Sequence, residues 1–489
     1  MFKELTDDNK NYNNLVGGKW GASNTGKYIA IHSPIDGALL GNVPAMSKEE
    51  VDHVIDVAEE AQKSWSNVPM HKRAAVLYRA ADILDERAEE IGRILCVEIA
   101  KDLKGAISEV NRTADFIRFT ADASKSIEGN VLPGESFPGF KRNKLSFVSR
   151  VPLGVVLAIS PFNYPVNLSA SKIAPAVAAG NSVVLKPPTQ GSISALYLAQ
   201  VFKEAGIPDG VLNTVTGKGS EIGDYIVTHP KIDFINFTGS TKVGHHISEI
   251  TVMKPLLMEL GGKDAAIVLE DADLELAADN IASGAFSYSG QRCTAVKRIL
   301  VMESVADKLV ELLKERIMKL KAGDPREEGV TIVPIINTGA ADFVMELIED
   351  AHSKGATPVV EAKREGNLIS AGLYDNVTLD MRIAWEEPFG PILPVIRINS
   401  MDEAVEIANK SEYGLQSSVF TTNIDKAFYI ADRLEVGTVQ INNKTERGPD
   451  HFPFLGVKSS GMGTQGIKYS IEAMSRPKAV VMNFHYKGI

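Results

Sequence analysis

The middle of the chain alternates short apolar runs with longer amphipathic stretches. Apolar runs of strand length occupy residues 155–159, 182–185, 212–215, 234–237 and 266–269. Apolar residues at helical spacing fill the gaps at 170–179, 193–205 and 221–228. This alternation predicts a doubly wound parallel α/β sheet, and ligands bind such sheets at the carboxyl ends of their strands.

A second alternating set follows Cys293. Its segments are 298–302, 306–320, 341–351, 404–408 and 427–434, so we expect a second α/β lobe. Before the first set, Ser47 and Glu50 form a capping box that predicts the start of a helix. Further helices are expected through 74–81, 88–100 and 107–119.

Residues 131–152 have a different character. Prolines and glycines are followed there by an alternating stretch, which predicts a β-hairpin arm that projects from the first lobe. Residues 479–484 alternate weakly and are expected to pair with this arm or with a partner subunit.

Length and charge narrow the class of protein. A chain of 489 residues is too long for one compact core. Its net charge of −10 argues against a nucleic-acid partner. The two cysteines make no disulfide framework. The polar N-terminus shows no signal peptide, and no apolar run approaches the roughly 20 residues that span a bilayer. A cytoplasmic protein without a membrane partner is therefore expected.

One of the two cysteines, Cys293, follows a Ser-Gly turn and lies between Arg292 and Thr294. A neighbouring cation lowers the pKa of a thiol, and the thiolate is the reactive form. A helix that began after Gly290 would add to this effect. Cysteine is also among the most buried and inert residues, which is our interpretation of Cys96 in its apolar helical run. The segment alone leaves both interpretations of Cys293 open.

Several loops after predicted strands are suited to a nucleotide. No GxGxxG motif is present, but Gly219 and the pair Gly239-Ser240 each follow a strand and open a helix, where free N–H groups suit a phosphate. Lys186 ends another strand and is placed to meet a ribose or a phosphate. Taken alone, a glycine turn without a ligand is the stronger interpretation of both glycine loops, of which Gly239-Ser240 is the better candidate, and Lys186 could be a solvated loop residue.

Two further side chains have catalytic potential. Asn163 follows a strand between two prolines, so its amide is held where it can face developing negative charge. Glu259 lies in an apolar, glycine-rich setting, where desolvation raises a carboxyl pKa toward the range of a general base. No GxSxG or HExxH motif occurs, so we expect neither a serine hydrolase nor a metal site.

Four segments, in order along the chain, resemble motifs of the aldehyde dehydrogenase superfamily, and the resemblance covers nearly the whole length. They are Pro161-Phe162-Asn163-Tyr164-Pro165, Glu259-Leu260-Gly261-Gly262-Lys263, Gly290-Gln291-Arg292-Cys293 and Glu387-Pro388-Phe389-Gly390-Pro391. The resemblance implies a Rossmann-like cofactor domain (residues 1–130 and 153–260) and a catalytic domain (261–470). It also implies an oligomerisation arm (131–152 and 471–489) and a homotetramer.

The resemblance also implies roles for particular residues. Cys293 is the nucleophile, Glu259 the general base, and Asn163 with the Cys293 N–H holds the oxyanion. The implied cofactor residues are Pro161, Phe162, Lys186, Thr189, Gly219, Gly239, Ser240, Glu387 and Phe389.

Within the superfamily the chain is most similar to the non-phosphorylating glyceraldehyde-3-phosphate dehydrogenases. The implied substrate-binding residues are Arg112, Asn163, Tyr164, Arg292, Thr294 and Arg447. An acidic chain needs such locally gathered arginines to bind a phosphate dianion. Glu446 is next to Arg447 in sequence and could pair with it in place of the substrate phosphate. Because Arg447 is distant in sequence from Cys293, its removal is expected to impair the phosphorylated aldehyde far more than unphosphorylated glyceraldehyde.

The expected cofactor is NADP. Relatives that prefer NAD commonly carry a glutamate three residues after the strand-end lysine, where this chain has Thr189. A carboxylate there would repel a 2′-phosphate, whereas a hydroxyl can donate to it. The predicted product is 3-phosphoglycerate. Three alternatives are an NADP-dependent dehydrogenase of another aldehyde such as a semialdehyde, a CoA-acylating enzyme, which normally lacks the glutamate base, and a non-catalytic relative.

Overall fold

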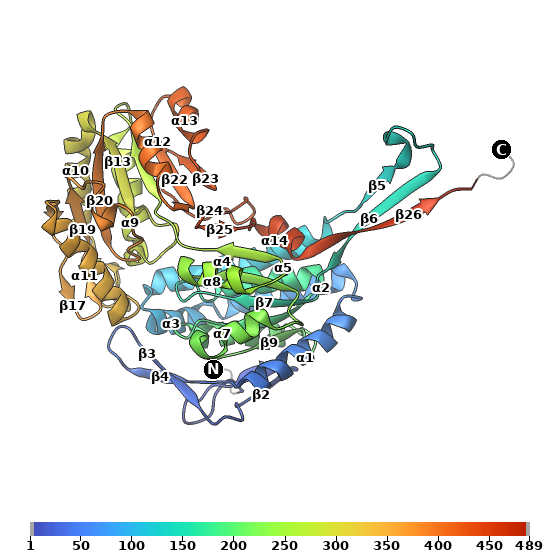
Figure 1. Cartoon of the computed structure of the whole chain (residues 1–489). Helices are drawn as coiled ribbons and strands as arrows, with labels where there is room; N and C mark the ends of the chain where they lie inside the picture. Colours follow the sequence, from blue (N-terminus) through green and yellow to red (C-terminus); the bar gives the residue numbers. More distant parts are fainter. Residues whose placement is uncertain (1–3, 486–489) are drawn as a thin grey trace.

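The computed structural model describes residues 4–485 and places two α/β lobes side by side with an arm extending from one of them (Figure 1). The first lobe is built on a six-stranded sheet of order β25-β11-β10-β7-β8-β9. Its strands are β7 (Val155–Ile159), β8 (Ser182–Lys186), β9 (Leu212–Thr214), β10 (Phe234–Thr238), β11 (Leu256–Glu259) and β25 (Gly461–Met462). All its pairings are parallel except that of β25 with β11.

Helices cover both faces of this sheet, as the alternating pattern predicted. They are α1 (Lys48–Trp65), α2 (Met70–Glu86), α3 (Ala88–Ile99), α4 (Leu103–Lys125), α5 (Asn167–Ala179), α6 (Ser192–Glu204), α7 (Gly219–Thr228) and α8 (Thr241–Ile250). The capping box is confirmed, because Ser47 caps α1 and exchanges hydrogen bonds with Glu50. The apolar pattern does not mark α8, because only Gly244 and Ile247 of that helix are buried, but the helix expected to open after Gly239-Ser240 is confirmed.

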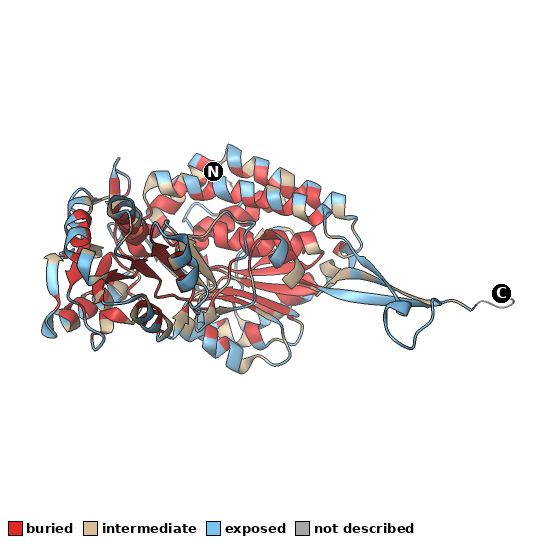
Figure 2. Ribbon diagram, turned by 90° about the horizontal axis from the view of Figure 1, so that it is seen from above, coloured by how far each residue is buried: buried red, intermediate tan, exposed pale blue. Residues whose placement is uncertain are grey.

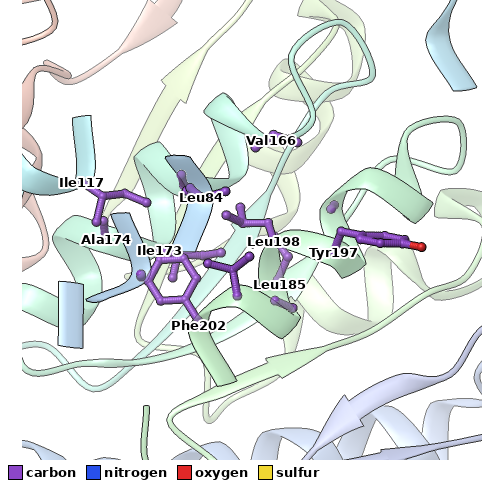
Figure 3. Packing of buried hydrophobic residues seen from close by; sticks show 14 of the residues in the cluster. Leu84, Ile117, Val166, Ile173, Ala174, Leu185, Tyr197, Leu198 and Phe202 are labelled. Atoms are coloured by element: carbon purple, nitrogen blue, oxygen red, sulfur yellow. The ribbon is translucent and has the colours of Figure 1, made fainter. Parts of the chain in front are cut away.

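One of the two core clusters of the first lobe lies between its sheet and the helices α2, α4, α5 and α6, and the other packs against α1, α7 and α8. Leu84, Ile117 and Ile173 come from three of these helices and pack close to Leu185 of β8 and Phe202 of α6 (Figure 3). Each such side chain contributes about 1.5–3 kcal/mol when it is removed from water. This packing of helices against the sheet fixes the positions of the ends of β7 and β8.

The second lobe is a seven-stranded sheet of order β16-β19-β20-β13-β12-β22-β23. Its strands are β12 (Ala265–Val268), β13 (Arg298–Met302), β16 (Thr357–Val360), β19 (Gly372–Asp375), β20 (Ile392–Ile398), β22 (Gln416–Phe420) and β23 (Thr438–Ile441). Its helices are α9 (Leu274–Phe286), α10 (Glu303–Ile317), α11 (Thr338–Ser353), α12 (Met401–Asn409) and α13 (Ile424–Ala431). The prediction of two α/β lobes is confirmed.

The arm is a three-stranded antiparallel sheet of β5 (Asn130–Pro133), β6 (Lys144–Pro152) and β26 (Ser475–Asn483). Strand β26 pairs with β6 along its full length, from Ser475 opposite Pro152 to Asn483 opposite Lys144. The expected pairing of the tail with the arm is therefore confirmed. The arm extends away from both lobes and is largely exposed (Figure 2). The last residues of the predicted arm, 486–489, lie outside the described part, and the three domain boundaries remain a prediction.

Short elements complete the fold. They are β1 (Asn14–Val16), β2 (Lys19–Gly21), β3 (Tyr28–His32), β4 (Leu39–Pro44), β14 (Lys321–Ala322), β15 (Val330–Ile332), β17 (Arg364–Glu365), β18 (Leu368–Ile369), β21 (Tyr413–Gly414), β24 (Val457–Lys458), α14 (Ile467–Ala473), and the 3-10 turns η1 (Gly134–Ser136), η2 (Ser287–Gly290) and η3 (Arg382–Ala384). Across residues 4–485, every helix is too short or too polar to cross a bilayer.

Candidate active site

A cavity of about 910 Å³ runs along the carboxyl ends of β7, β8 and β10 to the cysteine segment. Cys293 and Asn163 line it. So do the nine residues that the sequence assigned to the cofactor, namely Pro161, Phe162, Lys186, Thr189, Gly219, Gly239, Ser240, Glu387 and Phe389. The cavity therefore joins the candidate nucleophile to the loops that follow the strands.

One end of the cavity has the donors that a nucleotide phosphate needs. Lys186 ends β8 and is buried, which lowers its pKa to about 8. Thr189 is exposed on the same wall. Gly219 is the first residue of α7, and Ser240 caps α8, so free backbone N–H groups of two helices are also available. A cation, a hydroxyl and two helix N-termini fit NADP.

The other end of the cavity carries a carboxylate held by glycines. Glu387 Oε1 accepts a hydrogen bond from the Gly262 N–H at 3.1 Å. A Cβ on Gly261 would lie 2.3 Å from Glu387 Oε2, so a side chain there would displace the carboxylate. Phe389 has a left-handed backbone with φ of 45°, and its ring lies edge-on to Phe162 at 5.9 Å. This end therefore offers an acceptor for ribose hydroxyls between aromatic walls.

The cysteine segment is locked to its neighbours by close contacts. Gly290 has a φ of +69°, and a Cβ there would lie 2.5 Å from the carbonyl oxygen of Gly390. The Asn163 amide donates to the Gln291 carbonyl at 2.9 Å, which leaves its second N–H for a ligand. The four motif segments, far apart in sequence, thus meet around Cys293.

The Cys293 thiol faces a carboxylate. Its Sγ lies 3.6 Å from Glu259 Oε1. Burial, and then the charge of Glu259, raise the pKa of Cys293. Arg292 donates instead to the Gly284 carbonyl, and η2 ends at Gly290 without a helix after it. The expectation that Arg292 and a helix N-terminus lower this pKa is therefore wrong, because neither acts on the thiol.

Glu259 ends β11 and is 2% exposed. Its Oε2 accepts from Arg447 at 2.9 Å, so the buried carboxylate has a cation partner. Arg447 also donates to Gln465 at 2.8 Å and lies 3.6 Å from Asp450. Glu446 instead accepts from Asn443. The expected competition between Glu446 and Arg447 is therefore wrong.

A buried lysine that sequence analysis missed completes the surroundings of Glu259. Lys172 Nζ donates to the Thr238 hydroxyl at 2.7 Å, and that hydroxyl lies 3.4 Å from Glu259 Oε2. Burial lowers the pKa of Lys172 to about 7. Its signal in the sequence was a lone lysine within the apolar, alanine-rich run of α5.

The candidate phosphate residues are only partly brought together. Arg112 donates to both carboxylate oxygens of Asp450, at 2.8 and 2.9 Å, and to the Arg447 carbonyl at 2.8 Å. Arg112 and Arg447 therefore share Asp450. The Lys101 ammonium lies over the ring of Tyr164, 3.4 Å from the ring centre. The Thr294 carbonyl accepts a hydrogen bond at 2.9 Å from the hydroxyl of Thr445, which lies in the same loop as Arg447.

The other candidate phosphate arginine, Arg292, is turned toward Gly284. Among the candidate phosphate residues, Arg447 lines a second cavity of about 310 Å³ beside β23.

The structure combines a parallel α/β architecture with a thiol and a carboxylate at a cavity of nucleotide size, as in an enzyme. Comparison with known protein families identifies the class of enzyme. The model of the aldehyde dehydrogenase family matches residues 20–480. The chain therefore belongs to the aldehyde dehydrogenase family.

Similar proteins have narrower names. The chain is 59% identical over 474 residues to the NADP-dependent glyceraldehyde-3-phosphate dehydrogenase of Streptococcus equinus, covering 97% of this chain and 99% of that protein. It is 54% identical over 474 residues to the Pisum sativum protein of the same name, covering 96% and 95%. The solved structure of the NADP-dependent glyceraldehyde-3-phosphate dehydrogenase from Bacillus halodurans C-125, complexed with NADP, has a TM-score of 0.96 and 54% identity. It covers 97% of this chain and 100% of that one.

Proposed function

We propose that the chain oxidises D-glyceraldehyde 3-phosphate irreversibly to 3-phosphoglycerate and reduces NADP⁺. The observation that carries the proposal is the Cys293 thiol, 3.6 Å from a buried Glu259 carboxylate that Arg447 holds at 2.9 Å. A thiol beside a carboxylate supports acylation followed by hydrolysis. The names of the similar proteins support the same substrate and cofactor.

The proposed reaction begins at Cys293. Its thiol loses its proton to solvent, and the thiolate attacks the aldehyde carbon. The free N–H of Asn163 and the backbone N–H of Cys293 stabilise the resulting oxyanion. NADP, held by cavity residues such as Lys186, Thr189 and Glu387, would supply the hydride acceptor, and loss of the hydride from this carbon would leave a thioester on Cys293.

Hydrolysis then needs an activated water. Glu259 takes a proton from water, the hydroxide attacks the thioester carbon, and 3-phosphoglycerate leaves as Cys293 regains its thiolate. Lys172 and Thr238 extend the hydrogen-bonded chain behind Glu259. A glutamate base in this position favours water over CoA as the acyl acceptor, so it counts against a CoA-acylating enzyme.

Recognition of the substrate phosphate is proposed for Arg112, Tyr164, Arg292, Thr294 and Arg447. Arg112 and Arg447 already lie on either side of Asp450. A dianion would compete with Asp450 for their guanidinium groups, which bind phosphate with two parallel hydrogen bonds.

The substrate proposal predicts a large preference for the phosphorylated aldehyde. Two charge-assisted contacts, each worth about 1.5–3 kcal/mol, should raise kcat/KM for glyceraldehyde 3-phosphate at least about 100-fold above that for glyceraldehyde. Initial rates with both aldehydes, and with succinic semialdehyde for the alternative substrate class, measure this. Equal rates on both glyceraldehydes, or a faster rate with the semialdehyde, would remove the proposed substrate.

The cofactor proposal predicts that Thr189→Glu shifts preference toward NAD. A carboxylate beside Lys186 repels a 2′-phosphate and can accept from ribose hydroxyls. The ratio of kcat/KM for NADP to that for NAD should fall at least about tenfold. Thr357→Glu, at an exposed threonine of β16, is the control for added charge. If the wild type prefers NAD, or if Thr189→Glu leaves the ratio unchanged, the assignment of Thr189 fails.

We also propose a homotetramer assembled through the arm. Val480, Val481 and Met482 of β26 are 59%, 50% and 47% exposed, and β26 and β23 are both edge strands. Exposed apolar edges of this kind favour association with another chain. A monomer in sedimentation velocity would contradict this. The cytoplasmic location remains a proposal that cell fractionation can check.

A further inference from the structure

Lys297 is a buried lysine for which the mechanism above has no role. It lies between Cys293 and the start of β13, and it is 2% exposed. An ammonium group has three N–H donors and no acceptor, so its burial is costly unless acceptors surround it. The contacts of Lys297 therefore indicate what the rest of the site gains from it.

The Lys297 ammonium connects two walls of the cavity. It donates to the backbone carbonyl of Cys293 and lies 3.1 Å from Glu387 Oε1. The backbone N–H of Lys297 donates to the Asp264 carbonyl at 2.9 Å, which fixes the point from which the side chain extends. Within residues 4–485, no other lysine or arginine contacts both Cys293 and Glu387.

We infer that Lys297 is a positioning residue that holds the Cys293 backbone and the Glu387 carboxylate together as one unit. The carbonyl that it binds belongs to the peptide between Cys293 and Thr294, so the contact limits rotation of the backbone that carries the thiol. The same ammonium fixes Glu387 on the wall that offers an acceptor for ribose hydroxyls. This inference rests on the proposed function for the roles of Cys293 and Glu387.

The positive charge of Lys297 acts on the same two residues, Cys293 and Glu387, that its contacts hold in place. Burial and the charge of Glu259 raise the pKa of Cys293, whereas the Lys297 ammonium lowers it. Without Lys297, the thiolate would lose a nearby cation and Glu387 would lose its counter-ion. Both the reactivity of the thiol and the affinity for the cofactor should therefore fall.

The test replaces Lys297 with methionine, which keeps most of the side-chain volume and removes the charge. In a Cys96→Ala background, so that only Cys293 reacts, the rate of alkylation by iodoacetamide is measured against pH without substrate. The midpoint of this profile should move to higher pH by about one unit, with about tenfold slower alkylation below it. The Kd for NADPH, from a fluorescence titration, should rise about tenfold.

Lys354→Met is the matched control. Its ammonium also binds one backbone carbonyl and one carboxylate, the Asp380 carbonyl at 2.6 Å and Asp350 at 2.9 Å, but it lies just after the end of α11. It should leave both measurements unchanged. Lys297→Arg, which keeps a cation, should recover part of the shift in the alkylation midpoint.

An unchanged alkylation midpoint and an unchanged Kd for NADPH in Lys297→Met would overturn the inference, whatever happens to Tm. If that variant does not fold, Lys297→Gln keeps a donor without the charge, and the same unchanged profile in it would also overturn the inference. Neither readout uses an aldehyde. A wild type that fails on glyceraldehyde 3-phosphate would therefore refute the proposed substrate, while the role of Lys297 would still be decided by alkylation.

Discussion

Replacement of Glu259 by glutamine is expected to leave one rapid turnover and to remove most of the steady-state rate. Acylation of Cys293 still releases one NADPH per active site, but an amide cannot take the proton from the hydrolytic water. A general base contributes about 10²–10⁴-fold, so the steady-state rate should fall by at least about 100-fold. Stopped-flow absorbance of NADPH measures the burst and the rate that follows it.

The control for this variant is Glu270→Gln. Glu270 also forms a carboxylate–cation pair, at 2.6 Å from Lys426, but it is exposed and distant from the cavity. Its burst and steady-state rates should match those of the wild type. Steady-state release of acid by Glu259→Gln at the wild-type rate would exclude Glu259 as the base.

Removal of Arg447 is expected to impair both glyceraldehyde 3-phosphate and unphosphorylated glyceraldehyde. Arg447→Ala leaves the buried Glu259 carboxylate without its cation, and breaking a buried ion pair costs about 3–5 kcal/mol. We expect kcat/KM to fall about 100-fold or more on both aldehydes. From the sequence we expected a much smaller loss on unphosphorylated glyceraldehyde, and the 2.9 Å contact of Arg447 with Glu259 is the reason for the change.

Arg112→Ala supplies the contrast, because Arg112 contacts Asp450 and the Arg447 carbonyl but not Glu259. It should lower kcat/KM on glyceraldehyde 3-phosphate by about one to two orders of magnitude and have little effect on glyceraldehyde. Arg118→Ala, on the same helix and paired with Asp82 and Asp85, is the matched control. Equal losses on both aldehydes in Arg112→Ala would remove its phosphate role.

The fold was predictable because its information is local. The apolar runs that became β7 and β8 and the capping box at Ser47 each lie within one short window of sequence. Family membership followed from four short motifs, and it is confirmed. The structure adds a physical reason for two of their glycines, since a Cβ at Gly261 or Gly290 would collide with Glu387 or with the backbone of Gly390.

Contacts between distant segments were not predictable in this way. Glu259 and Arg447 are 188 residues apart, and neither local window indicates the other. The same difficulty explains why the expected effect of Arg292 on the pKa of the Cys293 thiol was wrong. Arg292 is next to Cys293 in sequence, but its guanidinium binds the Gly284 carbonyl, while the cation that contacts the Cys293 backbone is Lys297.

The central claim is that glyceraldehyde 3-phosphate acylates Cys293 and that water, activated by Glu259, releases the acid. Its most direct test is mass spectrometry of the Glu259→Gln variant, quenched in acid after mixing with glyceraldehyde 3-phosphate and NADP⁺. We predict a 3-phosphoglyceroyl adduct on the peptide that contains Cys293, none on the peptide of Cys96, and none on either peptide when Cys293→Ser is added. Full reduction of NADP⁺ with no adduct on Cys293, or an adduct on another residue, would contradict this account.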